Sequence, residues 1–437
     1  MATLAINGGP KLRNKPFPGY KTMGEEEKKA LKGVIDSGVL SRFLGCWHED
    51  FYGGPEVRAF EEEWAKAFNV KHVIAMNSAT SGLYAAVGAI GTEPGDEIIV
   101  SPFTMSASAV APLIYNAIPV FADIEPDYYC LDPQSVEARI TPYTRAIIVV
   151  DIFGLPYDAD AINAIARKHN LKVIEDCAQA PGALNSGKYA GTLGDIGIYS
   201  LNYHKHIHTG EGAMVVTDDD TLAERLRMIR NHAEAVTEAR GFETLVNMLG
   251  FNYRMTEMEA AVGREQLKKL PALLLERQNN VQYLTEKLTK IPCLKPATVR
   301  PGCTHAYYVH PIEFDAAAAE GLDRDQYVAA VKAELPPIEL REGEGVKLST
   351  GYVKPLYLQP IYQQRIAYGS HGCPWTSNFY KGNVDYSPGL CPVAEEKYSS
   401  TLMIHELMRP PFTQDDLNDV VNAFYKVWEN REELSGV

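Results

Sequence analysis

The sequence predicts an α/β fold, in which helices cover both faces of a mainly parallel sheet, with a smaller α+β domain toward the C-terminus. Between about residues 55 and 235, short apolar runs alternate with stretches of helical periodicity. Such runs, bounded by Gly, Pro or Asp, are typical of strands buried on both faces. They are EIIVSP (97–102), PVFADI (119–124), AIIVVDIFG (146–154), LKVIED (171–176), IGIYSL (196–201) and AMVVTD (213–218). Strands that alternate with helices indicate a mainly parallel sheet.

The stretches between these runs carry apolar side chains at the spacing of an amphipathic helix. In residues 78–91, Leu83, Val87 and Ile90 fall on one helical face, and residues 158–170 repeat the pattern. We therefore expect helices in both stretches, packed on the sheet.

The pattern changes at about residue 254, where a long helical stretch begins. Residues 255–291 predict long helix with a break at Pro271, because proline removes a helical hydrogen bond. A strand-like stretch follows at 305–314, and a terminal helix is expected from about Gln414.

Two domains follow from these shifts in composition. The large domain is expected over residues 1–270, with an N-terminal arm at about 1–25. The smaller domain is expected over 271–437, with a long insertion at about 340–390. Residues 351–391 carry too many aromatic side chains for disorder, so we expect an ordered loop there.

Composition excludes several classes of function. The chain has 437 residues, 46% hydrophobic and 22% charged, with a net charge of −14 and no basic cluster. Nucleic-acid and anionic-membrane partners are therefore not expected, and no apolar run approaches the roughly 18 to 20 residues that span a bilayer. The first residues lack the apolar core of a signal peptide, and seven scattered cysteines contain no CxxC pair. We expect a cytoplasmic protein with free thiols.

Polar residues that follow the predicted strands are candidates for a site, because ligands bind at the carboxyl ends of strands in open α/β sheets. They comprise hydroxyls at a helix start, an acid and an amide after one strand, and a serine and a lysine after another. These residues are Ser78, Thr80, Ser81, Asp176, Gln179, Ser200 and Lys205. Each alone has an ordinary explanation: a helix cap for the hydroxyls and the acid, a solvated surface position for the lysine.

Together these groups match the requirements of pyridoxal phosphate. Hydroxyls and free amides at a helix start bind phosphate. An acid keeps the pyridine nitrogen protonated, so that the ring absorbs the electrons of a carbanion, and a lysine forms the Schiff base and transfers the proton.

Longer segments resemble the DegT/DnrJ/EryC1/StrS family, the sugar aminotransferases of fold type I. The resemblance covers roughly residues 20 to 320 in order and reappears near 390 to 435. The segments that carry it include NSATSGLYAAVGAIGTEPGDEIIVSPFTMSASA, VIEDCAQAPGAL, GTLGDIGIYSLNYHKHIHTGEGAMVVTDD and GFNYRMTEMEAAVGREQLKKL. The resemblance implies a fold type I, pyridoxal-phosphate-dependent transferase with a sheet of the seven-stranded type.

The resemblance also implies roles for individual residues around the cofactor ring. Lys205 is the Schiff-base lysine and general acid/base, Asp176 pairs with the pyridine nitrogen, and Gln179 hydrogen-bonds the phenolic oxygen. The position that normally stacks an aromatic ring on the cofactor holds Met105, and Phe103 lies two residues away on the same strand parity. Which of the two covers the ring stays open.

The phosphate and the substrate have matching residues as well. The resemblance implies that Thr80, Ser81 and Ser200 bind the phosphate. Asn252 matches a residue that reaches the phosphate of the neighbouring subunit, which implies a homodimer with shared active sites. His305 matches a histidine often found near the substrate.

The implied reaction moves an amino group from L-glutamate or L-glutamine to a keto-sugar or keto-cyclitol, in the biosynthesis of amino sugars or secondary metabolites. The alternative acceptor is a nucleotide-linked 3- or 4-keto-hexose for cell-surface glycans. Arg254 and the tyrosine-rich insertion could bind an acidic donor or a diphosphate.

Two further readings belong to other classes of protein. Some relatives are sugar dehydratases that carry histidine in place of the Schiff-base lysine, whereas this chain has Lys205. A non-catalytic protein on the same scaffold would not need Asp176, Gln179, Ser200 and Lys205 together, which disfavours that reading.

Three histidines flank the lysine in YHKHIHTGEG (203–212). In an extended strand His204, His206 and His208 would share one face, opposite Lys205. Such a face could bind zinc, could simply be polar, or could place one histidine near the lysine to tune its proton transfers. Without a suitably spaced Cys, Asp or Glu, we expect no metal.

Overall fold

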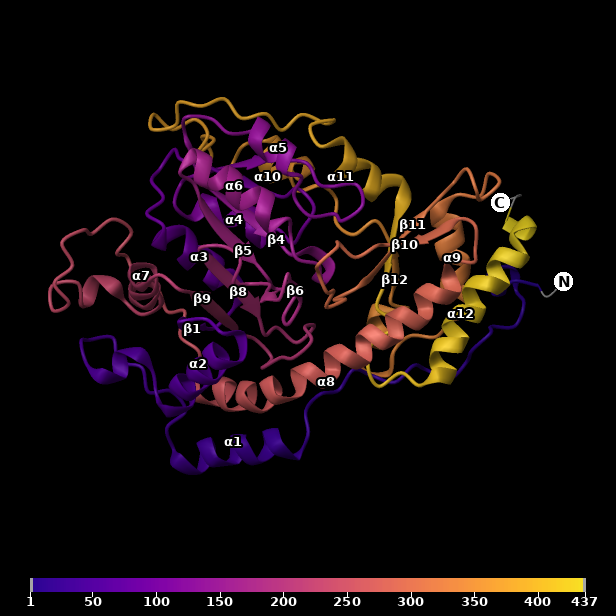
Figure 1. Cartoon of the computed structure of the whole chain (residues 1–437), viewed down its shortest axis with the longest axis horizontal. Helices are drawn as coiled ribbons and strands as arrows, with labels where there is room; N and C mark the ends of the chain where they lie inside the picture. The colour runs from indigo at the N-terminus through magenta and orange to yellow at the C-terminus, as the bar shows by residue number, and fades with distance from the viewer. Residues whose placement is uncertain (1–2, 435–437) are drawn as a thin grey trace.

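The computed structural model describes residues 3–434 and confirms the α/β fold, with a mostly parallel sheet of seven strands (Figure 1). The strand order is β1-β9-β8-β5-β4-β2-β3, and β9 is antiparallel to both of its neighbours. The strands are β1 (His72–Met76), β2 (Glu97–Val100), β3 (Ile118–Phe121), β4 (Thr144–Val150), β5 (Lys172–Asp176), β8 (Ile196–Ser200) and β9 (Ala213–Thr217). All but β1 coincide with the predicted apolar runs; β1 was not predicted.

The sheet separates two hydrophobic cores. Side chains alternate along a strand, and in β1 Ile74 and Met76 enter one core while Val73 and Ala75 enter the other. The first core is completed by α3 (Ala79–Ala89), α4 (Ala107–Ile114), α5 (Pro133–Ala138), α6 (Ala159–His169) and α7 (Asp220–Arg230). The second is completed by α2 (Pro55–Phe68) and the first half of α8. The predicted helices over 78–91 and 158–170 correspond to α3 and α6.

A single helix, α8 (Glu257–Leu288), runs beneath the large sheet toward the C-terminal sheet (Figure 1). The predicted break at Pro271 is therefore wrong. Pro271 lies on the exposed side of the helix, where water can bind the carbonyl that has lost its N–H partner. The expected domain boundary at 270/271 falls inside this helix, and the division into domains stays a prediction.

A second sheet lies in the C-terminal part of the chain. It is antiparallel, in the order β10-β11-β13-β12, and packs on α9 (Arg324–Glu334) and α12 (Gln414–Glu429). Its strands are β10 (Leu294–Pro296), β11 (His310–Phe314), β12 (Leu348–Thr350) and β13 (Leu402–His405). The strand expected at 305–314 thus begins only at His310, because Tyr307 turns the backbone with a φ of 49°.

The tyrosine-rich segment 351–391 covers β3, the edge strand of the large sheet. The Phe121 ring contacts the rings of Tyr357, Tyr362 and Tyr386 at centroid distances of 5.1–5.7 Å. The Tyr386 hydroxyl also donates to the Pro119 carbonyl at 2.6 Å. The segment, which includes α10 (Pro360–Gln363) and leads to α11 (Pro392–Glu396), therefore shields an otherwise exposed strand edge.

The remaining elements are α1 (Glu25–Ser37), which lies along α8, and the short hairpin β6 (Leu184–Asn185) and β7 (Lys188–Tyr189). Across residues 3–434, no helix combines the length and the apolar character that a membrane span requires.

Two buried histidines are paired in the smaller sheet. His405 accepts the Leu407 N–H at Nδ1, so its Nε2 carries the hydrogen and donates to His310 Nδ1 at 2.9 Å. His310 Nε2 then lies 3.3 Å from the Thr285 hydroxyl. Burial lowers the pKa of His310 to about 3 and that of His405 well below 6.5, so both rings are neutral in the fold.

We expect this pair to make the protein sensitive to acid. Below a pH near 6.5 these histidines bind a proton in the unfolded chain but stay neutral in the folded protein. Protonation therefore favours the unfolded state, and the free energy of unfolding decreases as the pH falls below 6.5. The loss at pH 5.5 is about 1.4 kcal/mol per histidine. The double variant His310→Gln/His405→Gln should flatten the pH dependence of the unfolding free energy, measured by urea titration from pH 7.5 to 5. His371→Gln, at an exposed position, is the control; an unchanged slope in the double variant would refute the assignment.

Candidate active site

The predicted site residues gather where the strands of the large sheet end. Asp176 is the last residue of β5 and Ser200 the last residue of β8. Asn77 and Ser78 follow β1 directly and lead into α3. Because these three strands point the same way, their carboxyl ends meet at one edge of the sheet.

Asp176 is a buried carboxylate with two hydrogen bonds. Its side chain is 5% exposed. The Ser108 hydroxyl, on α4, donates to Oδ2 at 2.7 Å, and the Ala178 N–H donates to Oδ1 at 3.2 Å. Burial raises the pKa of Asp176, while these two donors and the positive charge of Lys205 oppose the rise. The positive charge of Lys205 thus favours the ionised carboxylate.

Gln179 has both ends of its carboxamide occupied. The Phe153 N–H donates to Oε1 at 2.8 Å, and Nε2 donates to the Tyr352 hydroxyl at 3.1 Å. Phe153 reaches this position through a left-handed backbone, with a φ of 59°, just after β4. Tyr352 comes from the segment that covers the sheet edge and was not among the predicted site residues.

Lys205 lies against an aromatic ring that the sequence did not indicate. Its Nζ is 4.3 Å from the centroid of the Tyr308 ring, a distance at which an ammonium is attracted to the ring. Burial would raise the pKa of Tyr308, but Lys205, Arg409, Arg277 and Arg341 together hold it below 10. Lys205 and the three arginines thus concentrate positive charge around Tyr308 in a chain whose net charge is −14.

The segment with the three histidines around Lys205 is not an extended strand, so the condition for a shared histidine face is not met. Residues 203–207 form turns, with the Lys205 N–H donating to the Asn202 carbonyl at 2.9 Å, instead of a strand. The His204 ring contacts Arg341, and His206 is buried with Nε2 2.9 Å from the Ala306 carbonyl. The described residues 3–434 contain no group of three His, Cys, Asp or Glu arranged to hold a metal.

The loop that carries Lys205 is held by distant parts of the chain. The Tyr20 hydroxyl, in the N-terminal arm, donates to the His206 carbonyl. Arg341 donates to the Tyr203 carbonyl at 3.4 Å and stacks on the Tyr203 ring. The backbone position of Lys205 therefore depends on two segments distant from it in the sequence, around Tyr20 and Arg341.

The first turn of α3 provides backbone and hydroxyl donors just after β1. Ser78 caps the helix by accepting the Ser81 N–H at 3.1 Å, and the two hydroxyls are 2.9 Å apart. Thr80 lies between them in the first turn, whose amides have no partner inside the helix. The Ser200 hydroxyl, nearly buried at the end of β8, accepts the Asn202 N–H at 3.3 Å.

Asn252 and Arg254 lie next to this helix start within the same chain. The Asn77 side chain donates to the Asn252 carbonyl at 3.2 Å, and Arg254 pairs with Met76 at the end of β1. Arg254 donates to the side-chain oxygens of Asn252, at 2.8 Å, and Asn231, at 3.2 Å. No contact between either residue and Lys205 is present in the described part of the chain.

His305 occupies a different environment from Lys205. It is buried and stacked on the Tyr307 ring at 3.9 Å, and its Nδ1 accepts the Tyr307 N–H at 2.8 Å. Burial lowers its pKa to about 3. Tyr308 in the same segment, and not His305, is the side chain that meets the lysine.

The two residues considered for the cofactor face differ sharply in exposure. Met105 is 58% exposed after β2, whereas Phe103 is fully buried. The Phe103 ring packs edge-on against Phe153 and Tyr352. Phe103 therefore has no free face, and Met105 remains available to a ligand.

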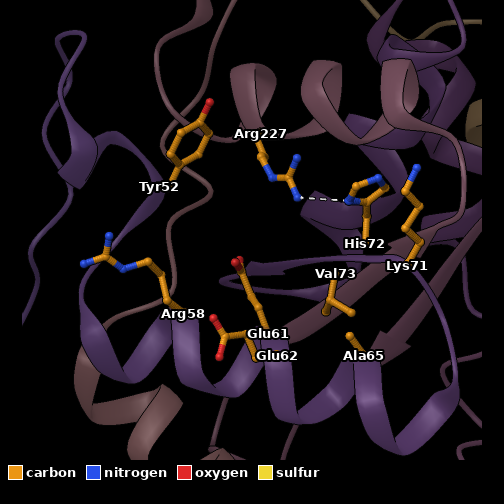
Figure 2. Close-up of a pocket in the computed structure, with 9 residues that line it drawn as sticks. All are labelled: Tyr52, Arg58, Glu61, Glu62, Ala65, Lys71, His72, Val73 and Arg227. Atoms are coloured by element: carbon orange, nitrogen blue, oxygen red, sulfur yellow. Dashed lines mark hydrogen bonds between the residues drawn. The ribbon is translucent and has the colours of Figure 1, made fainter.

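A cleft of about 370 Å³ lies elsewhere, between α2, α7 and the start of β1 (Figure 2). It is lined by Tyr52, Arg58, Glu61, Glu62, Ala65, Lys71, His72, Val73 and Arg227. Since His72 begins β1, the cleft sits at the amino end of that strand, opposite the edge that carries Asp176 and Lys205. We do not assign the site to it.

Known proteins resemble the chain over nearly its whole length. The L-glutamine:scyllo-inosose aminotransferase of Streptomyces griseus is 33% identical and covers 99% of both chains. The GDP-perosamine synthase of Caulobacter vibrioides is 38% identical over 63% of this chain and 72% of that protein. The solved aminotransferase of Psychrobacter cryohalolentis superposes with a TM-score of 0.78 and 29% identity, covering 95% of this chain and 99% of that one.

The fold and these similarities define the protein as an aminotransferase. The family pattern described as the DegT/DnrJ/EryC1/StrS aminotransferase family matches residues 23–385, and the chain belongs to that family.

The contact between Tyr20 and the lysine loop can be tested directly. Tyr20→Phe removes only the hydroxyl that donates to His206, worth about 1 kcal/mol. Backbone amides of residues 202–208 should then exchange their hydrogens roughly fivefold faster, measured by mass spectrometry, because local opening becomes easier. Tyr143→Phe, at an exposed position, should leave exchange in the loop unchanged. Equal exchange in wild type and Tyr20→Phe would show that the arm does not hold the loop.

Proposed function

We propose that the protein is a pyridoxal-phosphate-dependent aminotransferase that transfers the amino group of L-glutamine or L-glutamate to a keto-cyclitol or keto-sugar. The observation that carries the proposal is that Asp176, Ser200 and the start of α3 all follow parallel strands at one edge of the sheet, with Lys205 in the loop after β8. The relatives support the donor and the acceptor, since one is named for L-glutamine and scyllo-inosose.

The residues present suit this cofactor. The free amides of α3 with the Ser81 and Ser200 hydroxyls offer donors to a phosphate, and buried Asp176 offers an acceptor to a protonated ring nitrogen. Gln179 keeps one amide N–H for the ring's phenolic oxygen, and exposed Met105 can pack on the ring. When bound, pyridoxal phosphate supplies the aldehyde and the electron sink for amino-group transfer.

Lys205 acts on the proton that this chemistry requires. With the cofactor bound, its amine would take a proton from the substrate carbon and would return it at the cofactor carbon. The Tyr308 ring stabilises the charged lysine, because an ammonium is attracted to the face of the ring. Hydrogen bonds from Tyr20 and Arg341 hold the backbone of the loop that carries the lysine.

A second acceptor class has its own support. The Caulobacter relative is named a GDP-perosamine synthase and is 38% identical over the part that aligns. A nucleotide-linked keto-hexose is therefore the second candidate. The first is favoured because the match to the cyclitol enzyme covers 99% of this chain, including the segment over the sheet edge.

The chain also carries an apolar face suited to a second copy of itself. Two loops, 39–52 and 232–250, lie together at the left of Figure 1: Asn231 donates to the Leu44 carbonyl at 2.8 Å, and Arg240 stacks on Trp47 at 4.3 Å. Their exposed apolar side chains are Val39, Leu40, Leu44, Trp47, Leu245, Val246 and Leu249, each at least 39% exposed. This face leads directly into Asn252, so a homodimer would place that residue at the interface.

All seven cysteines are free thiols. This supports the further proposal that the enzyme works in the reducing cytoplasm.

The cofactor and its acceptor can be tested in one series. Purified protein with pyridoxal phosphate should show a visible band that borohydride bleaches, with the label on Lys205 by peptide mass spectrometry. Lys205→Ala should lose the label, and Lys188→Ala, on the β6–β7 hairpin, should keep it. The pyridoxamine form should regain the band with keto-cyclitols faster than with nucleotide-linked keto-hexoses. A label elsewhere would refute the site, and the reverse order of acceptors would favour the second candidate.

The dimer proposal predicts a mass of twice 48.3 kDa in solution. Leu249→Asp puts a charge on the apolar face and should shift the protein toward the monomer in light scattering after size exclusion. Leu275→Asp, at a position 59% exposed against 70% for Leu249 but on α8, is the matched control. A monomeric wild type, or the same mass for both variants, would contradict the assigned interface.

A further inference from the structure

Tyr352 reaches the candidate site from the small C-terminal sheet. Strand β12 ends at Thr350, and Gly351 turns the chain with a φ of 61° while its N–H donates to the Leu402 carbonyl at 2.7 Å. A Cβ at position 351 would lie 2.7 Å from the Tyr398 carbonyl oxygen, so the turn requires glycine. The chain then leaves the small sheet and inserts Tyr352 against the core of the large one.

Two phenylalanines that follow strands of the large sheet hold the Tyr352 ring. Phe153 meets it edge-on at 5.0 Å and 82°, and Phe103 at 5.9 Å and 70°. Such edge-to-face contacts fix the plane of the ring. They therefore also fix the place of its hydroxyl, which accepts a hydrogen bond from Gln179.

The orientation of the Gln179 carboxamide follows from its partners. The Phe153 N–H can only donate, so the atom that faces it at 2.8 Å is the oxygen Oε1. Nε2 then points to Tyr352 and donates one of its two hydrogens to the Tyr352 hydroxyl. The second hydrogen is left for an acceptor in the site.

We propose that Tyr352 is a positioning residue: with the Phe153 amide it locks the Gln179 carboxamide, so that the remaining N–H donates to the phenolic oxygen of the cofactor. This inference rests on the proposed function, and it names a residue from the C-terminal part of the chain that acts through Gln179. Tyr352 is protonated at neutral pH, since burial raises its pKa above 10. Its hydroxyl is thus a neutral acceptor for the amide.

The lock has a spectroscopic consequence. A hydrogen bond to a phenolate stabilises the form of the lysine-bound chromophore that has lost its proton, and so lowers the pKa of that chromophore. Tyr352→Phe keeps the ring but frees the amide, and the pKa read from the pH titration of the visible band should rise by about half a unit to one unit. A purely structural role of the ring would not move this pKa.

The matched control lies in the same segment. Within residues 3–434 the buried Tyr362 hydroxyl has no hydrogen-bond partner, so Tyr362→Phe should leave the titration unchanged. Gln179→Leu should raise the pKa at least as far as Tyr352→Phe does. If Tyr352 acts through Gln179, the double variant should show no further rise. An unchanged pKa in Tyr352→Phe, or full additivity with Gln179→Leu, would overturn the proposal.

A cofactor-free measurement separates this proposal from the proposed function. Without cofactor, Tyr352→Phe and Gln179→Leu should each lower the melting temperature, on the order of 1–2 °C, with no additional loss in the double variant. A wild type that does not bind pyridoxal phosphate at Lys205 would overturn the function alone. Additive losses in the cofactor-free protein would overturn the lock.

Discussion

The structure depends on holding one carboxylate, that of Asp176, out of water at the carboxyl edge of the sheet. A buried charge that loses its partner destabilises a protein by about 3 kcal/mol or more, so its surroundings are constrained. The hydroxyl from α4, the amide of Ala178 and the positive charge of Lys205 meet this demand from three places in the chain. The start of α4 and the turn after β5 are thereby set against each other.

Lys205 belongs to a group of positive charges around Tyr308. Lys205, Arg277 and Arg409 gather around the Tyr308 phenol, and the two guanidinium groups are almost fully buried. In a chain with a net charge of −14 this is a local concentration of positive charge. Such a field attracts anionic groups, carboxylates and phosphates alike. Electrostatics and the strand-end geometry therefore favour the same type of ligand.

The sequence predicted what depends on local pattern. The apolar runs located the strands, and Asp176, Ser200 and Ser78 follow strands, so the pattern of residues alone was enough to predict that they gather at one edge. Strand β1 was missed because its single run, HVIAM, lies between two helices without the bounding turn residues that marked the others. The break at Pro271 failed because exposure of that side of α8 makes proline tolerable there.

Contacts between distant segments could not be read from such patterns. Tyr308 and Tyr352 reach the site only because β11 and β12 belong to a separate sheet whose chain returns to the large one. The histidines looked like one face of a strand, but the bond from the Lys205 amide to Asn202 makes the segment a turn.

The segment that returns from the small sheet to the large one has two roles, a contact with Gln179 and the covering of β3. Residues after Gly351 first supply Tyr352 to Gln179 and then cover the edge strand β3 with aromatic side chains. An edge strand left bare would invite pairing with another chain, so this cover has a structural reason of its own. Once the cover is present, Tyr352 near its start lies at the strand ends, hydrogen-bonded to Gln179 of the candidate site. A substitution that loosens the cover therefore has a direct path to the active site, through one hydroxyl and one carboxamide.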